Sequence, residues 1–505
     1  MSDTSAPRLK MPDAALEQSR MMLDKARWAA ARMQKLDRAT VLRIADAVAK
    51  AGHAKAQAYA EQAVRETGMG VVAHKKIKNE ACSTGLVDLY RHEDFVAPRI
   101  HADRKIVELP RPAGVIFALV PVTNPVATVY FKTLLALMTR NAIVLSPHPQ
   151  AKGVCADAAR TLAEAAKAAG APDGVIQVIE APTIPLIEQL MGDDRVDLIV
   201  ATGGPAVVKA AYRSGNPAIG VGPGNAPVVV DDTADIKLAA KRIVASKSFD
   251  NSILCTNESV VLAFTSIADR LLDAMKAERA HICSPEECDK LRALLFTETG
   301  FNVGMIGKDA EVIARAAGFN ASGARILVTP VTMVQPEEKL VREKLAPVLA
   351  FARVQGIDQA LAAARSMMRK AGQGHSAAIH SKSEANVMAF AAAIPALRVA
   401  VNAGCSLGAS GFETNLGPSM TIGTGFAGGS SLAENLTPHQ FVQFTRIAYN
   451  KEAGEVFGNY AGLDPLHLPK RTVAPVSLAV DNGDQALRAE LRKIILEELK
   501  AVMAA

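Results

Sequence analysis

Aromatic residues are scarce in this 505-residue chain, where phenylalanine, tryptophan and tyrosine together make up 4%. Surfaces that bind single-stranded nucleic acid stack the bases on aromatic side chains, and so few aromatics argue against such a surface. The net charge of +6 is spread along the sequence without a lysine- or arginine-rich block. We therefore expect no nucleic-acid partner, although the positive charge suits small anionic ligands.

Cysteine is too rare for a disulfide framework in a chain of this size. The six cysteines are Cys82, Cys155, Cys255, Cys283, Cys288 and Cys405. His281, Cys283 and Cys288 lie near one another in the sequence, but no second pair of ligands follows at zinc spacing. We expect no metal site.

Long apolar runs are also missing, since none approaches the length that crosses a membrane. The first twelve residues are polar and lack the apolar centre of a secretory signal. We therefore expect an intracellular, cytoplasmic protein. At 505 residues, 49% hydrophobic and 21% charged, the chain should be globular and divide into two or three domains.

The N-terminal region 13–67 spaces its apolar residues as helices do, with charges between them. The segment 100–112 alternates and predicts a projecting hairpin or an edge strand, closed by Pro110 and Pro112.

From Gly114 the pattern changes to alternating strands and helices. Strands are predicted at 115–120, 142–145, 175–179, 197–201 and 228–230, with helices at 130–138, 151–169, 184–191 and 206–213 between them. This rhythm predicts a doubly wound parallel sheet, in which ligands bind beyond the carboxyl ends of the strands.

Two glycine-rich loops follow these strands. Thr202-Gly203-Gly204-Pro205 joins a predicted strand to a helix, and Gly220-Val-Gly222-Pro-Gly224-Asn-Ala-Pro227 follows soon after. Glycines at such a turn let backbone N–H groups approach a phosphate, but many loops use glycine only for its backbone freedom. Two such loops before a candidate nucleophile strengthen the functional interpretation.

Cys255 is that candidate. It lies between a polar turn at Asp250, Asn251 and Ser252 and an apolar run after Glu258, where a thiol can face a cleft. A free cysteine is more often a small core residue, so Cys255 needs support from the rest of the chain.

A second αβ region runs to about residue 429, with strands predicted at 260–264, 325–328, 348–354 and 398–401. It contains a turn, Gly372-Gln-Gly374-His375-Ser376, and a glycine-rich run at 404–431. We expect four parts: a first domain at 1–245, a second at 246–430, a closing and oligomerisation segment at 431–467, and a tail at 468–505.

Six motifs then occur in one order: Pro121-Val-Thr-Asn-Pro125, Ser146-Pro-His-Pro149, Ala201-Thr-Gly-Gly-Pro205, Pro217-Ala-Ile-Gly-Val-Gly222, Ser248-Phe-Asp-Asn251 with Cys255, and Glu343-Lys-Leu-Ala-Pro347. With this set the chain resembles the CoA-acylating aldehyde dehydrogenases over residues 13–450. That family includes the dehydrogenase half of bifunctional aldehyde–alcohol dehydrogenases and enzymes of bacterial microcompartments. The resemblance implies an α/β fold with a Rossmann-type NAD-binding domain, a catalytic thiol domain and an oligomerisation arm.

The resemblance also implies roles for single residues. Cys255 attacks the aldehyde as a thiolate, while Asn124 and the Cys255 backbone N–H stabilise the oxyanion. Hydride transfer to the nicotinamide leaves a thioester on Cys255, and His375 is the candidate base for an incoming thiol, although turn histidines are often structural. The implied cofactor contacts are Ser146, Thr202, Gly203, Gly204, Gly222 and Glu343, the last at the nicotinamide ribose. Ser146-Pro-His148 lacks the lysine that contacts the adenosine ribose in hydrolytic members, so we expect NAD but leave NADP open.

The loop 214–230 contains no carboxylate, whereas hydrolytic aldehyde dehydrogenases keep a glutamate there that activates water. Without that base the acyl-enzyme persists until a better nucleophile such as CoA arrives. We expect acetaldehyde or propionaldehyde as substrate and an acyl-CoA as product. The alternatives are an acylating sulfoacetaldehyde dehydrogenase, an enzyme that releases the free acid, and a catalytically silent scaffold. Retention of Cys255, Asn124 and Glu343 argues against the scaffold.

The tail predicts a linker at 468–483, an N-cap at Asp484 and a helix at 485–503. One stripe of this helix carries Leu487, Leu491, Ile494, Ile495, Leu499 and Val502, interrupted by Glu498. The helix either docks on its own oligomer, expected to be a homodimer or a dimer of dimers built through the 100–112 hairpin, or addresses the enzyme to a microcompartment shell. The resemblance favours the second interpretation.

Overall fold

The computed structural model describes residues 13–298, 300–466 and 482–503, and it separates into two compact units, 1–458 and 459–505. The larger unit begins with helices α1 (Asp13–Met33), α2 (Arg38–Ala54), α3 (Ala56–Thr67) and α4 (Val72–Glu80). A π-helical turn, η1 (Ala81–Gly85), joins α4 to α5 (Leu86–Tyr90). The helical pattern predicted for 13–67 is therefore confirmed.

The first sheet has five parallel strands in the order β5-β4-β3-β6-β7. These are β3 (Val115–Val120), β4 (Ala142–Pro147), β5 (Ile176–Val178), β6 (Leu198–Ala201) and β7 (Ala218–Gly220). Every residue of β3, β4 and β6 is buried, as in parallel strands covered on both faces. Helices α6 (Pro125–Met138) and α7 (Lys152–Ala168) pack with α2, α8 (Ile184–Met191) packs with α1, and α9 (Pro205–Arg213) packs on β6 and β7. The predicted doubly wound sheet is confirmed.

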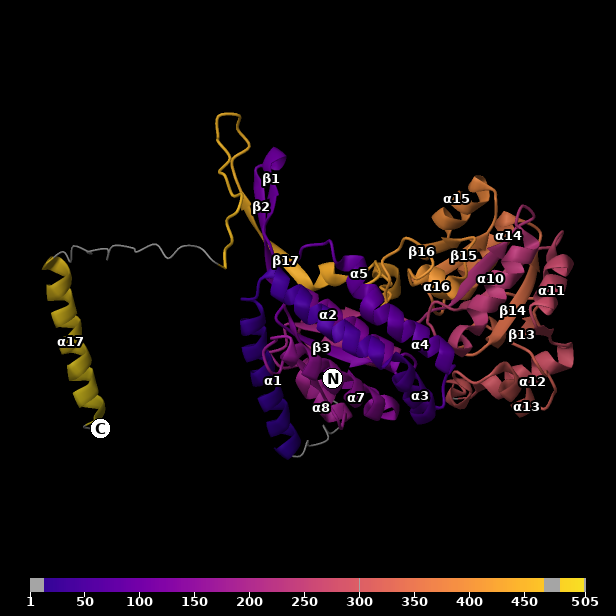
Figure 1. The fold of residues 1–505 in the computed structure, drawn as a ribbon, viewed down its shortest axis with the longest axis horizontal. Helices are drawn as coiled ribbons and strands as arrows, with labels where there is room; N and C mark the ends of the chain where they lie inside the picture. Colours follow the sequence, from indigo (N-terminus) through magenta and orange to yellow (C-terminus); the bar gives the residue numbers. More distant parts are fainter. Residues whose placement is uncertain (1–12, 299, 467–481, 504–505) are drawn as a thin grey trace. The chain divides into compact units, whose positions relative to one another are not determined.

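The second sheet has seven parallel strands in the order β10-β13-β14-β9-β8-β15-β16. Its strands are β8 (Ala226–Val230), β9 (Glu258–Phe264), β10 (Ala280–Ile282), β13 (Ile326–Pro330), β14 (Val348–Val354), β15 (Ser376–His380) and β16 (Arg398–Val401). Its helices are α10 (Ile236–Ser248), α11 (Ala268–Ala277), α12 (Pro285–Leu295), α13 (Ala310–Ala316), α14 (Ile357–Met368), α15 (Glu384–Ala393) and α16 (Cys405–Ala409). Figure 1 shows the two sheets with their helices as neighbouring lobes of the larger unit.

The predicted boundary at residue 245 places β8 in the first domain, but β8 belongs to the second sheet. β8 pairs with β9 and β15 of the seven-stranded sheet, so the crossing between the sheets falls between β7 and β8. A short run of buried apolar residues indicates a strand but does not specify which of two sheets it joins.

A three-stranded antiparallel sheet, ordered β1-β2-β17, extends from the lobe that carries β3 (Figure 1). It consists of β1 (Arg99–His101), β2 (Ile106–Pro112) and β17 (Val442–Ala448). The hairpin is confirmed, but the prolines do not close it, since Pro110 and Pro112 pair with Phe444 and Val442 of β17. β1 pairs with β2 only as far as Glu108, so beside Pro110 and Pro112 the described residues place no strand on the side of β2 away from β17. The N–H groups that these prolines lack would face that side, so no hydrogen bond between strands is lost.

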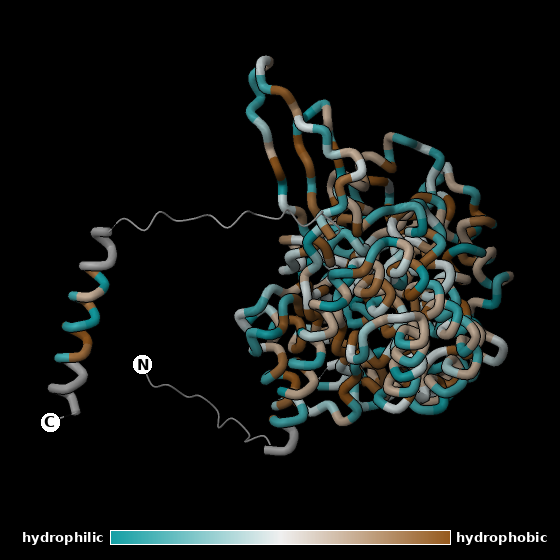
Figure 2. The backbone as a smooth tube through the Cα atoms, turned by 60° about the vertical axis from the view of Figure 1, so that its left-hand side comes forward, coloured by the Kyte–Doolittle hydropathy of each residue, from teal (hydrophilic) through white to brown (hydrophobic). Residues whose placement is uncertain are grey.

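The smaller unit contains α17 (Asn482–Met503). This helix begins before Asp484, so Asp484 is not its N-cap. Of the predicted linker at 468–483, the last two residues belong to the helix, and 468–481 lie outside the described residues. Apolar and polar positions alternate along the middle of α17 (Figure 2). Leu487, Leu491, Ile494 and Ile495 of the predicted stripe are exposed, together with Leu496. The side chains of Leu499 and Val502 lie outside the described part. Of the helices in the described residues, none has both the length and the apolar character needed to cross a bilayer.

Candidate active site

Cys255 follows a backbone segment of unusual conformation. After α10 ends, Asp250, Asn251 and Ser252 have φ values of 47°, 53° and 65°. Non-glycine residues rarely adopt this left-handed conformation, and it is retained where the surroundings enforce it, often at functional sites. The polar turn predicted at these three residues is therefore present, and it leads directly to the thiol.

A buried lysine holds the turn that carries Cys255. The backbone N–H of Asn257 donates to the Leu254 carbonyl at 3.0 Å, closing the turn around Cys255. Lys247 Nζ donates to Asn257 Oδ1 and to the Glu258 carbonyl, both at 2.6 Å. Because Lys247 is fully buried, these bonds form in a low-dielectric interior and fix the turn against α10.

The surroundings of Cys255 favour a protonated thiol. Its side chain is half-buried, and burial raises the pKa of the thiol to about 12, with the Glu343 carboxylate acting in the same direction. The Arg398 guanidinium and the backbone N–H groups of Cys255 and Thr256 oppose this rise in pKa. At neutral pH only a small fraction is thiolate, so Cys255 would need activation to act as a nucleophile.

Gly224 lies between Cys255 and Glu343. Its N–H donates to Glu343 Oε1 at 3.0 Å, and a Cβ at this position would lie 1.9 Å from the Cys255 carbonyl oxygen. Only glycine permits the glycine-rich loop to approach the nucleophile so closely. Burial raises the pKa of Glu343 to about 7, opposed by the Gly224 N–H, Lys247 and Lys344.

Asn124 directly precedes α6, in the turn that follows β3. Its Nδ2 donates to Thr123 Oγ1 at 3.2 Å, and its Oδ1 accepts a short hydrogen bond from Lys78 Nζ. Lys78 also donates to Asp250, two residues after Ser248. Through Lys78, Asn124 is joined to the segment that leads to Cys255.

His375 is fully buried immediately before β15. Its Nδ1 lies 2.9 Å from Ser376 Oγ, while its Nε2 has no hydrogen-bond partner. Burial and the Arg398 charge lower the pKa of His375 to about 3, which makes it a weaker base than the sequence prediction assumed. Arg398 donates to the Gly374 carbonyl at 2.9 Å, so the same guanidinium influences both Cys255 and the His375 turn.

Of the predicted cofactor residues, Thr202, Gly203 and Gly204 follow β6, and Gly222 lies on the second glycine-rich loop. Ser146 is buried in β4, and its Oγ lacks a hydrogen-bond partner. Thr202 Oγ1 lies 2.9 Å from Thr421 Oγ1, and Gly222 N–H donates to Thr424 Oγ1 at 3.4 Å. Gly203 and Gly204 are exposed at the start of α9, and no atom lies within 4 Å of a Cβ built on Gly204. The open space at the N-terminus of α9 fits a dinucleotide phosphate, whereas the Ser146 hydroxyl is buried from solvent.

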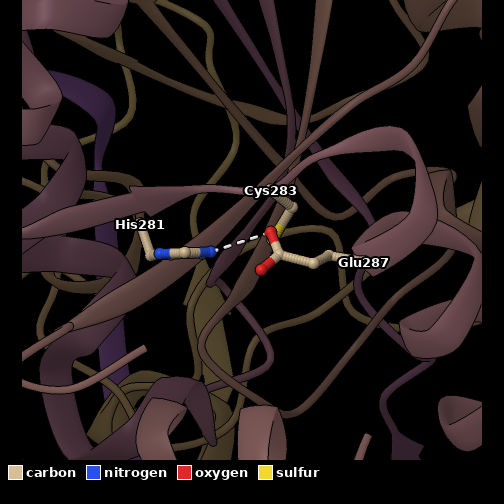
Figure 3. Close-up of side chains that lie close together, drawn as sticks. All are labelled: His281, Cys283 and Glu287. Carbon is tan, nitrogen blue, oxygen red and sulfur yellow. Dashed lines mark hydrogen bonds and ion pairs between the residues drawn. The ribbon is translucent and has the colours of Figure 1, made fainter. Parts of the chain in front are cut away.

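His281, Cys283 and Glu287 form a separate cluster (Figure 3) in which one ligand atom of each lies within 4.8 Å of the others. His281 Nε2 and Glu287 Oε2 are 2.9 Å apart, and Glu287 also accepts the Ser284 N–H at 2.8 Å. These contacts pair the polar atoms with one another and cap α12. The expectation that this cluster binds no metal stays a prediction.

The structure therefore brings Cys255, Gly224 and Glu343 together directly, and it joins Asn124 and His375 to them through Lys78 and Arg398. Sequence reasoning missed Lys78, Lys247 and Arg398. A lysine or arginine in a mixed polar helix or at a strand start ordinarily predicts a solvated position, and the sequence gives no sign that these three are buried.

The model of the aldehyde dehydrogenase family matches residues 3–417 of the chain. An aldehyde-alcohol dehydrogenase of Clostridium acetobutylicum is 39% identical over 401 residues, covering 78% of this chain and 46% of that protein. The chain thus spans about half the length of the first curated relatives it matches. A succinate-semialdehyde dehydrogenase (acetylating) of Clostridium kluyveri is 33% identical, covering 86% of this chain and 96% of that protein.

The crystal structure of an acetylating aldehyde dehydrogenase from Geobacillus thermoglucosidasius has a TM-score of 0.85 at 36% identity, covering 87% of this chain and 98% of that one. The chain belongs to the aldehyde dehydrogenase family, within its CoA-acylating group.

Proposed function

We propose that this protein oxidises a short-chain aldehyde to its acyl-CoA, with NAD as the hydride acceptor and Cys255 as the nucleophile. The observation that carries the proposal is the loop 214–230, which contains no carboxylate yet packs through Gly224 against the Cys255 carbonyl. A loop in this position without a base for water favours transfer of the acyl group to a thiol.

In the proposed reaction, the Cys255 thiolate adds to the aldehyde carbonyl carbon and the carbonyl π pair moves to oxygen. Asn124 Nδ2 and the Cys255 backbone N–H are the proposed donors to that oxyanion. A bound nicotinamide supplies the acceptor for the aldehyde hydride. The thiol of CoA then attacks the Cys255 thioester, and Cys255 leaves as thiolate.

Ser146, Thr202, Gly203, Gly204, Gly222 and Glu343 are the proposed dinucleotide contacts. The open start of α9 supports this assignment. Glu343 is assigned to the nicotinamide ribose because its Oε1 is held by Gly224 while the carboxylate stays near the thiol. NAD is the proposed acceptor because of the family resemblance, and the missing lysine in Ser146-Pro-His148 leaves NADP as the alternative.

The proposed acceptor is supported by a related structure. A propionaldehyde dehydrogenase of Rhodopseudomonas palustris, 27% identical with a TM-score of 0.77, was crystallised with bound CoA and an acylated cysteine. His375 stays the proposed base for the CoA thiol. Its low pKa requires that binding of CoA changes the environment of the imidazole, or that the thiol arrives already ionised.

Acetaldehyde and propionaldehyde are the proposed substrates. Relatives of 32% and 33% identity are named for sulfoacetaldehyde and succinate semialdehyde, whose tails are anionic. A panel of these four aldehydes at equal concentration, ranked by kcat/KM, identifies the substrate class. The highest value for a neutral aldehyde supports the proposal, and a large preference for an anionic one contradicts it.

The reaction itself is tested by following NADH with propionaldehyde, NAD and the purified chain, with and without CoA, and by identifying the product by mass spectrometry. We expect sustained turnover only with CoA, and one propionyl-CoA per NADH. Free propionate formed at the same rate without CoA would contradict the proposal.

The proposed assembly is a homodimer or a dimer of dimers built through the sheet of β1, β2 and β17, whose edge strand β17 pairs on one side only. Light scattering tests it, and a monodisperse monomer would contradict it. The proposed role of α17 is to deliver the enzyme to a microcompartment shell. Its exposed apolar side chains support this role, as do related propionaldehyde dehydrogenases of a Clostridium phytofermentans microcompartment.

A further inference from the structure

A buried lysine contacts the amide oxygen of Asn124. Lys78 lies on α4 and donates from Nζ to Asn124 Oδ1 and to Asp250 Oδ2 through two short hydrogen bonds. The relative exposures of Lys78, Asn124 and Asp250 are 2%, 9% and 0%. A charge removed from water this completely is retained only with close partners, and both partners of Lys78 belong to the proposed catalytic region.

A second lysine completes the cluster without contacting Asn124. Lys75 Nζ lies 3.2 Å from Asp250 Oδ2 and donates to the Thr123 carbonyl at 3.0 Å. Asp250 Oδ1 accepts the Val71 N–H at 2.6 Å, so the carboxylate has partners on both oxygens. With both lysines charged, two cations and one anion leave a net positive charge beside Asn124.

The ammonium of Lys78 determines which way the Asn124 amide faces. An ammonium group only donates hydrogen bonds, so Lys78 donates to the Oδ1 side of the amide and cannot pair with the Nδ2 side. This orientation leaves the two Nδ2 hydrogens for other acceptors, and the Thr123 hydroxyl at 3.2 Å is a long contact for one of them. A charged donor on Oδ1 also polarises the amide and strengthens its N–H as a donor.

We propose that Lys78 is a positioning residue that orients and polarises the Asn124 amide toward the oxyanion formed when Cys255 attacks the aldehyde. The inference rests on the proposed function and concerns its first chemical step. In that step a sulfur–carbon bond forms and the carbonyl π pair moves onto oxygen, which is the charge that Asn124 Nδ2 meets. Lys78 itself transfers no proton.

The test is Lys78→Met, which keeps a long apolar side chain in the buried position and removes the donor. The measurement is the pre-steady-state burst of NADH from propionaldehyde and NAD before CoA is added. We expect the burst rate to fall by about tenfold to a hundredfold, below the loss from removing an oxyanion donor outright. The affinity for NAD should stay unchanged, and Lys78→Arg should restore most of the rate because it keeps a charged donor.

A double-mutant cycle with Asn124→Ala separates positioning from a structural role. If Lys78 acts through Asn124, Lys78→Met should cause no further loss of burst rate in the Asn124→Ala background. Lys75→Met is the matched control, since it removes a charge from the same cluster without touching Asn124, and it should lower the rate less. The inference is overturned if Lys78→Met lowers the burst rate equally in the unaltered protein and in Asn124→Ala. It is also overturned if Lys75→Met lowers the burst rate as much as Lys78→Met does.

Alkylation of Cys255 by iodoacetamide gives a second measurement, because this reaction forms no oxyanion. Its rate should be the same in Lys78→Met and in the unaltered protein, and a parallel fall in alkylation and burst assigns Lys78 a structural role. If Lys78→Met fails to fold, Lys78→Met with Asp250→Asn removes both charges of the pair and is measured in its place. A failure of the proposed function would look different. In that case the unaltered protein would give a normal burst of NADH, but no acyl-CoA would form after CoA is added.

Discussion

The backbone N–H of Gly224 donates a 3.0 Å hydrogen bond to Glu343 Oε1, and the same glycine lies against the Cys255 carbonyl. A Cβ on Gly224 would lie 1.9 Å from that oxygen, so Gly224→Ala must displace the glycine-rich loop or the turn that carries the thiol. We expect kcat to fall by about a hundredfold, because a displacement of about 1 Å at reacting groups has that effect. Gly356→Ala is the control, since nothing lies within 4 Å of its Cβ, and steady-state kinetics of both variants make the comparison. Equal activity in both would show that the close approach is not needed.

Cys255 should be the reactive thiol, and its reactivity should depend steeply on pH. Because burial raises its pKa to about 12, the thiolate fraction of the free enzyme grows about tenfold per pH unit through the accessible range. Iodoacetamide labelling followed by peptide mass spectrometry should show a rate at Cys255 that still rises at pH 10. A plateau near pH 7 would contradict the burial of this thiol.

Cys255→Ala should abolish NADH formation. The matched variants Cys82→Ala and Cys405→Ala should keep it, since both of these thiols are buried from solvent whereas Cys255 is half-buried. Turnover in Cys255→Ala at the rate of the unaltered protein would remove the nucleophile from the account.

Glu343 should make the free enzyme less stable as pH rises. Its folded-state pKa is raised from 4.5 to about 7, so the folded state binds more protons than the unfolded state between these values. Stability present below pH 4.5 is therefore lost as pH rises through 7. Glu343→Gln should raise the melting temperature relative to the unaltered protein more at pH 8 than at pH 5. The control Glu188→Gln, at an exposed position on α8, should show no such difference. If Glu343→Gln raised the melting temperature more at pH 5 than at pH 8, the prediction would be refuted.

The tail should act as a targeting sequence when it is fused to another protein. Residues 468–505 fused to a fluorescent protein should form puncta in cells that assemble the cognate shell, since the exposed leucines and isoleucines of α17 offer an apolar face to a partner groove. An Ile494→Lys, Ile495→Lys version of the fusion is the control and should stay diffuse. Diffuse fluorescence of the unaltered fusion, with the tail-deleted enzyme still entering shells, would exclude this role.

The sequence predicts the local elements of this fold more securely than their long-range partners. The bounds of β3 and α8 agree with the prediction because each is a strongly patterned apolar segment between clear turn residues. β8 lies inside the first predicted domain but pairs with β9 and β15 of the second sheet, because long-range packing decides the partner of a short apolar strand. β15 was missed because its sequence, Ser376-Ala-Ala-Ile-His380, is short and has little of the β-branched and aromatic character of a strand.

For the site, the position of Cys255 beyond a polar turn and the absence of a carboxylate in 214–230 are visible in the sequence. The supporting residues are not. Lys75 and Lys78 stand among other charged residues of α4 in a pattern typical of a solvated helix, and only the tertiary structure places Asp250 and Asn124 against them. Burial of a charge depends on a partner far away in the chain, which a local pattern does not contain.

The central claim is that Cys255 carries the acyl group until CoA accepts it. The most direct measurement mixes the enzyme with propionaldehyde and NAD without CoA, quenches it with acid, and determines the mass of the peptide that contains Cys255. The account predicts a propionyl adduct on Cys255, formed with one NADH per active site, which disappears on addition of CoA as an equal amount of propionyl-CoA appears. An unmodified Cys255 peptide during turnover, or an adduct that decays to propionate at the same rate with and without CoA, would contradict the account.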